Sequence, residues 1–167
     1  LPIIYSEDRL VQMKRVHELI EKFPAQRIAV VGDLMLDRYI WGSASRISQE
    51  APVPVVAVTR RSAAPGGAAN VLRNISSLGA QPVAFGVIGQ DSAGDELIEL
   101  LNEQQVDTSG VLQRSARVTS EKTRIIAEHQ QIVRVDNERI EAIEQEDCAE
   151  LITRLREAIE NGRIDGI

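Results

Sequence analysis

A glycine-rich segment, Pro65-Gly66-Gly67-Ala68-Ala69-Asn70, is expected to turn sharply and lead directly into a helix. Glycine lets the backbone approach a ligand closely, and the Asn70 amide, in the first helical turn, can both donate and accept hydrogen bonds. A helix N-terminus adds free N–H groups and a partial positive charge. The segment therefore suits a polyhydroxylated or anionic small molecule, although taken alone it also describes an ordinary helix start.

Two aspartates, Asp33 and Asp37, follow a short apolar strand predicted for residues 27–31. In open α/β sheets, ligands bind beyond the carboxyl ends of the strands, and these carboxylates fall there. Either one could accept hydrogen bonds from sugar hydroxyls or act as a general base. The alternative is that Asp33 is a turn residue and Asp37 a solvated loop acid.

Three arginines, Arg46, Arg124 and Arg134, lie in the β-rich parts of the chain together with Lys122. A guanidinium presents a planar fork of N–H donors that binds phosphate oxygens in pairs. These residues could therefore hold the anionic end of a substrate. The alternative for each is a solvated strand face, where only the aliphatic stem packs against the protein.

Two common nucleotide-binding motifs are excluded by the sequence. Gly89-Gln90-Asp91-Ser92-Ala93-Gly94 has the glycine spacing of a phosphate-binding loop, but Asp95 and Glu96 stand where that loop needs Lys and Ser or Thr. No Gly-x-Gly-x-x-Gly follows a strand, so the dinucleotide fingerprint is absent. We expect Gly89, Asp91 and Gly94 to shape the turn before the next helix.

Metal binding and disulfide formation find no support in the sequence. His17 and His129 are far apart, so we expect one on a helix surface and the other in a hairpin turn. The single cysteine, Cys148, excludes an internal disulfide and a cysteine-based zinc site, and it is expected to pack as a small residue.

The composition is that of an ordinary globular protein. With 167 residues, 43% of them hydrophobic, the chain is long enough for one domain with a core. A formal net charge of −6 gives nucleic-acid binding no electrostatic support, and no apolar run approaches the length of a membrane span. Residues 1–23 do not resemble a signal peptide, so the cytoplasm is the simplest compartment.

Periodicity and turn residues predict alternating strands and helices. Helices are expected over residues 6–23, 71–78, 95–104 and 144–161, and strands over residues 27–31, 39–41, 53–58, 82–88, 111–112, 122–127 and 131–135. Residues 39–41 and 53–58 are expected to be short strands around a polar loop, with Pro52 and Pro54 favouring a sheet edge. The order predicts an α/β sheet with a separate pair of β-rich excursions.

Taken together, these segments resemble the ribokinase-like (phosphofructokinase-B type) sugar kinases. The resemblance rests on Gly32-Asp33-x-x-x-Asp37 after a strand, the glycine-rich segment, and Gly89-x-Asp91-x-x-Gly94, which occur in the order and spacing of that family. Residues 45–56 (Ser-Arg-Ile-Ser-Gln-Glu-Ala-Pro-Val-Pro-Val-Val) are similar to the D-glycero-D-manno-heptose 7-phosphate kinase domain of bifunctional ADP-heptose synthesis proteins. Residues 122–124 and 130–136 are similar to that group too, and the resemblance covers about residues 25–167.

This resemblance implies a ribokinase-like open sheet with flanking helices and a small β-rich lid at about residues 38–60 and 118–137, with residues 1–24 as an N-terminal helix. It implies phosphoryl transfer from ATP, with Mg²⁺, to O1 of heptose 7-phosphate for lipopolysaccharide core assembly. Asp37 matches the acid that binds sugar hydroxyls, and Gly66, Gly67 and Asn70 match the sugar-binding turn. The lid implies a homodimer. We expect the 7-phosphate to lie near Arg46, Arg124 or Arg134, because these residues are positively charged and belong to the lid segments.

The family's Gly-Ala-Gly-Asp motif, which carries the catalytic base, is expected beyond Ile167, as are its main nucleotide-binding segments and any adenylyltransferase domain. Residues 25–167 are therefore expected to be the sugar-binding half of a kinase domain, with no cofactor bound and no turnover of ATP alone. One alternative is another sugar or nucleoside kinase of this fold. The other is a non-catalytic sugar-binding or dimerisation module.

Overall fold

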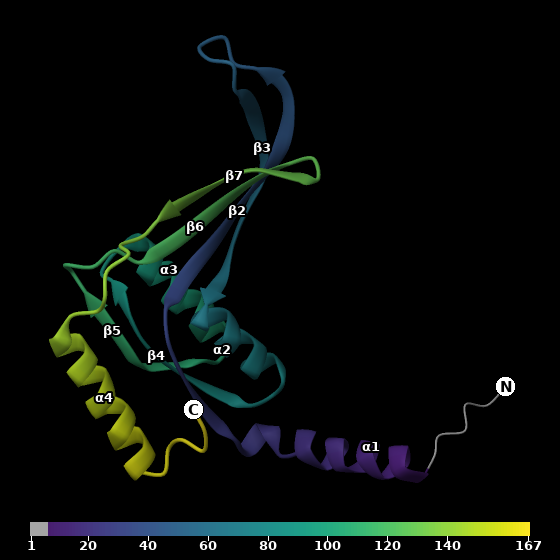
Figure 1. Ribbon diagram of the computed structural model, residues 1–167, viewed down its shortest axis with the longest axis vertical. Helices are drawn as coiled ribbons and strands as arrows, with labels where there is room; N and C mark the ends of the chain where they lie inside the picture. The colour runs from purple at the N-terminus through teal and green to yellow at the C-terminus, as the bar shows by residue number, and fades with distance from the viewer. Residues whose placement is uncertain (1–6) are drawn as a thin grey trace.

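The computed structural model describes residues 7–167 (Figure 1). Within this part of the chain, the helices are α1 (Glu7–Ile20), η1 (a 3-10 helix, Phe23–Ala25), α2 (Ala68–Ser77), α3 (Ser92–Glu103) and α4 (Gln145–Glu160). The strands are β1 (Arg27–Val31), β2 (Leu34–Ile47), β3 (Pro54–Gly67), β4 (Gln81–Gly89), β5 (Asp107–Arg114), β6 (Ser120–Ala127) and β7 (Gln130–Asn137). Ser6, the predicted first residue of the N-terminal helix, lies outside the described residues.

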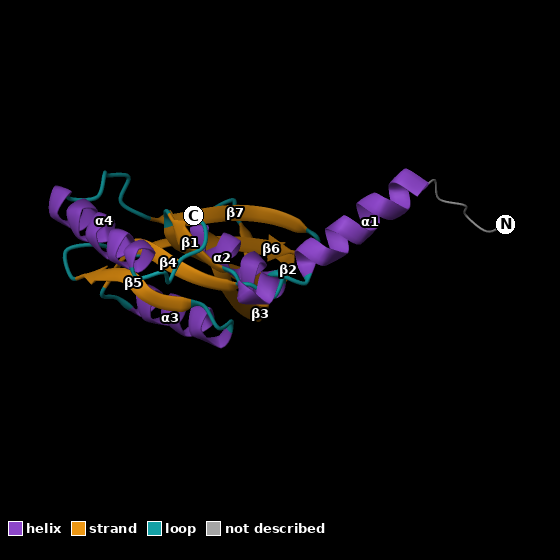
Figure 2. Ribbon diagram, turned by 90° about the horizontal axis from the view of Figure 1, so that it is seen from below, coloured by secondary structure: helices purple, strands orange, loops and turns teal. Residues whose placement is uncertain are grey.

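Three parallel strands form a central sheet in the order β1-β4-β5. The middle strand, β4, is buried along nearly its whole length because helices cover both faces of the sheet. Leu72 of α2 and Leu97 of α3 pack with Ile88 on one face, and Leu151 of α4 packs with Phe85 on the other. Figure 2 shows α3 and α4 on opposite sides of these strands. The predicted α/β sheet is confirmed.

A second, four-stranded sheet extends from one end of the first, in the order β3-β2-β6-β7 (Figure 1). The β2–β3 and β6–β7 pairs are antiparallel, and β2 runs parallel to β6. The two β-rich excursions and the predicted hairpin through residues 128–130 are thus confirmed, and both expected lid segments lie largely within this sheet. The edge position favoured by Pro52 and Pro54 is confirmed too, because β3 is an outer strand.

The prediction of short strands at 39–41 and 53–58 was wrong in length, because β2 and β3 each run for 14 residues. Two residues that often interrupt strands, Gly42 and Pro65, lie inside these longer strands. Gly42 lies at a register shift between Trp41 and Gly42, where a bulge tolerates glycine. Pro65 is accommodated because an edge strand does not need every backbone N–H. The loop between the strands contracts to a short turn, in which Ser48 N donates to the Val53 carbonyl at 2.8 Å.

The expected sharp turn at residues 65–67 is also corrected. Pro65 and Gly66 are paired strand residues opposite Leu36 and Met35. Only Gly67 turns, with φ 55° and ψ −132°, and it caps the N-terminus of α2. This left-handed φ favours glycine. Asn70 lies in the first turn of α2, as predicted.

Two backbone junctions connect the sheets. Where β1 passes into β2, the Ala68 N–H donates to the Asp33 carbonyl at 2.9 Å, which ties the start of α2 to the start of β2. Before β6, the Thr119 N–H donates to Asp91 Oδ2 at 2.8 Å, and the Gly89 N–H donates to Thr119 Oγ1 at 2.9 Å. The end of β4, the start of α3 and the start of β6 are therefore held together at one point.

The N-terminal helix α1 projects away from the two sheets (Figure 2), and His17 lies exposed on it, as predicted. Among the described residues, no helix combines the length and the apolar character needed to cross a membrane.

Candidate functional site

Asp37 belongs to β2 and is not a loop residue. Side chains alternate along a strand, and its neighbours Leu34 and Leu36 are 2% and 0% exposed in the core beneath the second sheet. Asp37 therefore points to the opposite surface of that sheet. We call this surface the Asp37 face and define it by Asp37, Tyr39, Gly66, Lys122, Arg124 and Arg134.

Arg124 fixes the Asp37 carboxylate. β6 runs beside β2 with Arg124 opposite Tyr39, and Arg124 Nη1 donates to Asp37 Oδ1 at 2.6 Å. The Arg124 guanidinium carbon also lies 5.5 Å from the centroid of the Tyr39 ring, a cation–π contact. The hydrogen bond to Asp37 outweighs the opposing effect of burial and raises the pKa of Arg124. The pair is thus a fixed carboxylate with a permanently charged partner.

Gly66 leaves the space that the Asp37 carboxylate occupies. A Cβ atom on Gly66 would lie 2.7 Å from Asp37 Oδ2, and one on Gly67 would lie 2.6 Å from the Asp33 carbonyl oxygen. Both distances are too short for side chains to tolerate without movement. The two glycines therefore serve the close approach of Asp33 and Asp37, in addition to any approach by a ligand.

The basic residues of β6 and β7 share the Asp37 face and are already partly neutralised. Lys122 Nζ lies 2.8 Å from Glu138 Oε2 and 3.3 Å from Asp136 Oδ2, and the Glu138 hydrogen bond leads the contributions that raise the pKa of Lys122. Arg134 donates to both oxygens of Asp136, at 2.8 and 2.9 Å. Because β7 places Arg134 opposite Arg124, two guanidinium groups neighbour each other on this surface.

Sequence reasoning missed an aromatic row on the same surface. Tyr39 and Trp41 stack with ring centroids 6.1 Å apart, and the Arg60 guanidinium carbon lies 4.7 Å from the centre of the Trp41 ring. The alternation Asp37-x-Tyr39-x-Trp41 was a usable signal, because residues two apart share one face of a strand.

Not all the predicted site residues are brought together. Asp37, Gly66, Arg124 and Arg134 share one surface, whereas Asp33 and Asn70 lie at the junction beside Gly67. Asp33 is exposed and Asn70 half-buried. Arg46 is exposed and pairs with Val55 near the far end of the β2–β3 hairpin. Because an extended strand rises about 3.3 Å per residue, Arg46 lies roughly 30 Å along β2 from Asp37.

The turn at Gly89–Gly94 does not fit a nucleotide phosphate. The Gly94 N–H donates to Asp91 Oδ1 at 2.8 Å, and the Gly89 N–H donates to Thr119 Oγ1. A phosphate-binding loop needs such N–H groups free, and the Asp91 carboxylate would repel the anion. The predicted turn before the next helix is confirmed, and within it Asp91 caps α3. Within the described part of the chain, no group of three or more His, Cys, Asp or Glu side chains is placed to hold a metal ion.

Residues 25–164 match the pfkB family of carbohydrate kinases. The chain is 42% identical to the bifunctional protein HldE of Mesorhizobium japonicum over 89% of its own length and 30% of the relative's. It is 52% identical to HldE of Helicobacter acinonychis over 68% of its length and 24% of the relative's. The chain thus spans less than a third of the curated relatives that it matches.

Solved structures support the same fold. A Clostridium perfringens protein assigned as a sugar kinase superposes with a TM-score of 0.61 over 81% of this chain and 41% of its own, at 17% identity. A carbohydrate kinase from Agrobacterium tumefaciens superposes with a TM-score of 0.55 over 67% of this chain and 35% of its own, at 21% identity. The fold is ribokinase-like, and the chain belongs to the pfkB family of carbohydrate kinases.

Proposed function

We propose that the Asp37 face binds the hydroxyl groups of D-glycero-D-manno-heptose 7-phosphate, and that the full-length protein phosphorylates this sugar at O1 with ATP. The observation that carries the proposal is the Asp37 carboxylate, fixed by Arg124 at 2.6 Å and accommodated by Gly66. The choice of heptose rests on the resemblance of residues 45–56 to heptose kinase domains, which the similarity to the HldE proteins supports.

Asp37 acts by holding the sugar. An ionised carboxylate offers about four acceptor positions, of which Arg124 uses one on Oδ1. The remaining positions can accept charge-assisted hydrogen bonds from sugar hydroxyls. Arg124 and Gly66 already restrict the rotation of the carboxylate. The side chain of Asp37 therefore loses little conformational entropy when the sugar binds. Asn70 and Asp33, at the junction beside Gly67, extend the same site.

Arg124 is the arginine best placed for the 7-phosphate. Only its Nη1 atom donates to Asp37, which leaves further N–H donors of the guanidinium for a phosphate oxygen. Arg134 has already committed Nε and Nη2 to Asp136, so it contributes mainly charge. Arg46, at the end of the hairpin, would need a different arrangement of the lid to contribute.

The second sheet has the exposed apolar edge expected of a homodimer interface. Its outer strand β7 is exposed throughout, with Val133 at 45% and Val135 at 53%. On the β2–β3 hairpin, Ile47 is 62% exposed. An unpaired edge strand with apolar side chains favours pairing with another chain. Light scattering after gel filtration should give a dimer mass that Val135→Lys shifts to a monomer, and a monomeric wild type would contradict this interface.

The ATP, Mg²⁺ and catalytic base of the proposed reaction are assigned to other parts of the full-length protein, since the turn at Gly89–Gly94 does not fit a nucleotide. Because the relatives are bifunctional proteins of which this chain covers 24–30%, a further adenylyltransferase domain is proposed as well. A cytoplasmic location follows from the use of ATP and a phosphorylated sugar.

A substrate panel on the full-length protein tests the proposal. ADP release should show the highest kcat/KM with heptose 7-phosphate, ahead of fructose 6-phosphate and ribose, and ³¹P NMR should show a new phosphate at O1. A preference for either other sugar would assign a different kinase of this fold. Binding of heptose 7-phosphate without turnover by the full-length protein would assign a sugar-binding module.

A further inference from the structure

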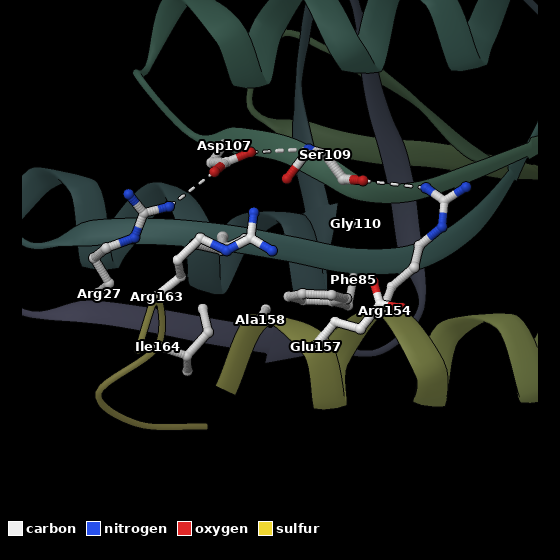
Figure 3. A pocket seen from close by; sticks show the side chains of 11 residues that line it. Arg27, Phe85, Asp107, Ser109, Gly110, Arg154, Glu157, Ala158, Arg163 and Ile164 are labelled. Carbon is white, nitrogen blue, oxygen red and sulfur yellow. Dashed lines mark hydrogen bonds and ion pairs between the residues drawn. The ribbon is translucent and has the colours of Figure 1, made fainter. Parts of the chain in front are cut away.

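A polar cavity of about 220 Å³ lies between α4 and the parallel sheet (Figure 3). It lies near the N-terminal ends of β1 and β5, whereas the Asp37 face extends beyond the opposite end of β1. Its apolar lining includes Val83, Phe85, Ala158 and Ile164. Three arginines from different elements surround it: Arg27 of β1, Arg154 of α4, and Arg163 after α4.

One wall of this cavity is an ion pair between Arg27 and Asp107. Arg27 Nη2 donates to Asp107 Oδ2 at 2.9 Å, and the Ser109 N–H donates to Asp107 Oδ1 at 2.9 Å. Burial alone would raise the pKa of Asp107, but the Ser109 hydrogen bond and the Arg27 charge outweigh it and lower the pKa. Asp107 is therefore ionised with both oxygens engaged. Arg27 Nε is buried without a hydrogen-bond partner among the described residues, and such a donor calls for an acceptor.

The opposite wall is formed by Arg154, which is also engaged. Its Nη1 atom donates to the Ser109 carbonyl at 3.2 Å, and its Nη2 atom lies 2.5 Å from Glu150 Oε1. Arg154 is therefore held in place at the cavity by contacts to β5 and to its own helix.

Arg163 is different, because its guanidinium points into the cavity between these walls (Figure 3). Among the described residues drawn around the cavity, no hydrogen bond or ion pair reaches it. The residue is exposed, but its backbone is held, since the Arg163 N–H donates to the Ala158 carbonyl at 2.9 Å and Gly162, with φ 63°, closes α4 before it. The backbone thus presents to the cavity a charged guanidinium that has no bonded partner among the described residues, in a lining that also holds the carboxylates of Asp107 and Glu157.

We propose that this cavity binds a small phosphate monoester, with Arg163 as its principal ligand and Arg27 and Arg154 on either side. Guanidinium groups bind phosphate oxygens in pairs, and the apolar lining suits the carbon body of the ester. The volume lies below the roughly 300–1,000 Å³ of cavities that hold drug-sized ligands. A nucleotide is therefore too large, and a phosphate on a few carbons fits.

An NMR titration of the 167-residue chain at low ionic strength tests the proposal, with inorganic phosphate and glycerol 3-phosphate as probes. The amide signals of Ser109, Gly110 and Arg163 should shift and saturate with both probes, and glycerol 3-phosphate should bind more tightly because of the apolar lining. Equal affinity for the two probes would contradict the assigned monoester.

Three variants make the test specific. Arg163→Gln should weaken binding roughly tenfold or more, since it removes a charge-assisted contact. Glu157→Gln should strengthen binding, because it removes from the rim a negative charge that repels the phosphate. The matched control is Arg156→Gln, which removes the same charge from an exposed position of α4 outside the cavity. Equal weakening in Arg163→Gln and Arg156→Gln, or no saturable shifts, would overturn the proposal.

The test is independent of the proposed sugar site. Asp37→Asn should leave the shifts at Ser109 and Gly110 unchanged, because Asp37 lies on the other sheet. Shifts confined to the Asp37 face would overturn the cavity site while leaving the sugar site standing.

Discussion

Arg124 Nη1 donates to Asp37 Oδ1 at 2.6 Å, across two strands whose residues lie 87 positions apart in the chain. The pair exists because β6 runs parallel beside β2 and brings its side chains onto the same surface. Its side chains are 23% and 18% exposed, so solvent screens it less than a surface pair. The carboxylate that is proposed to hold the sugar is thereby fixed by a strand from the far half of the sequence.

Removal of the charge of Arg124 should weaken heptose 7-phosphate binding most among the three candidate arginines. Arg124→Gln loses the contact that orients Asp37 as well as the proposed phosphate contact, so we expect roughly a 10- to 100-fold higher Kd. Arg134→Gln should have a smaller effect, and Arg46→Gln should have almost none. Calorimetric titration of the three variants measures the order, and an equal loss in all three would contradict the geometry.

Gly66→Ala should weaken sugar binding while the protein stays folded. The new Cβ would lie 2.7 Å from Asp37 Oδ2, and the end of that side chain can move away more easily than the backbone. The carboxylate would then leave its bond with Arg124. Gly166→Ala is the matched control, because its Cβ would meet only the end of the Ile28 side chain at 3.3 Å. Binding equal to the wild type in Gly66→Ala would argue against the placement of Asp37.

Asp91 should make the fold sensitive to acid. Burial raises the pKa of its carboxyl, but the hydrogen bonds from Thr119 and Gly94 outweigh this and lower the pKa. Because the unfolded value is about 4, the stabilisation is complete above that pH and is lost as the pH falls through the lower folded value.

In Asp91→Asn, the side-chain oxygen can still accept a hydrogen bond from the Gly94 N–H. The new NH2 group, however, is a donor and would face the Thr119 N–H, which is also a donor. We expect a loss of about 1–2 kcal/mol in the free energy of unfolding at pH 7, and a smaller loss of stability on acidification. Urea denaturation at several pH values measures both. Asp95→Asn, in the same helical turn, should change little, and equal effects of the two variants would contradict the role of Asp91.

The overall class was predictable because its signals are local. The buried strands at 27–31 and 82–88 are apolar runs, and the helices that cover them show an apolar stripe. Gly79 and Gly162 directly follow two of the predicted helices, as glycines at helix ends do, and both have positive φ values. The order of strands and helices then left few arrangements other than an α/β sheet.

The long strands and the Asp37–Arg124 pair were not predictable, because they depend on tertiary position. Pro65 and Gly42 break strands in general, but an edge and a bulge accommodate them here. The identity of the arginine that contacts Asp37 depends on the β2–β6 register, which no short segment encodes. From the sequence alone, Arg46, Arg124 and Arg134 were therefore equally good candidates for the phosphate contact.

The 167-residue chain alone should release no ADP in the presence of heptose 7-phosphate and Mg·ATP. The N–H groups at Gly89 and Gly94 are already bonded within the protein, and Asp37 is assigned to sugar binding. A coupled ADP assay measures this, with the full-length protein as the positive control. Heptose-dependent ADP release by the chain would show that it holds a nucleotide site and a base.

The most direct measurement is a ligand-observed NMR titration of the chain with heptose 7-phosphate, because this method detects weak binding. Asp37→Asn keeps the shape of the side chain but removes its charge, and it should raise the Kd roughly tenfold or more. Glu99→Gln, which removes a negative charge from an exposed position of α3, should match the wild type. A Kd for folded Asp37→Asn equal to that of the wild type would contradict the sugar-binding role of the Asp37 face.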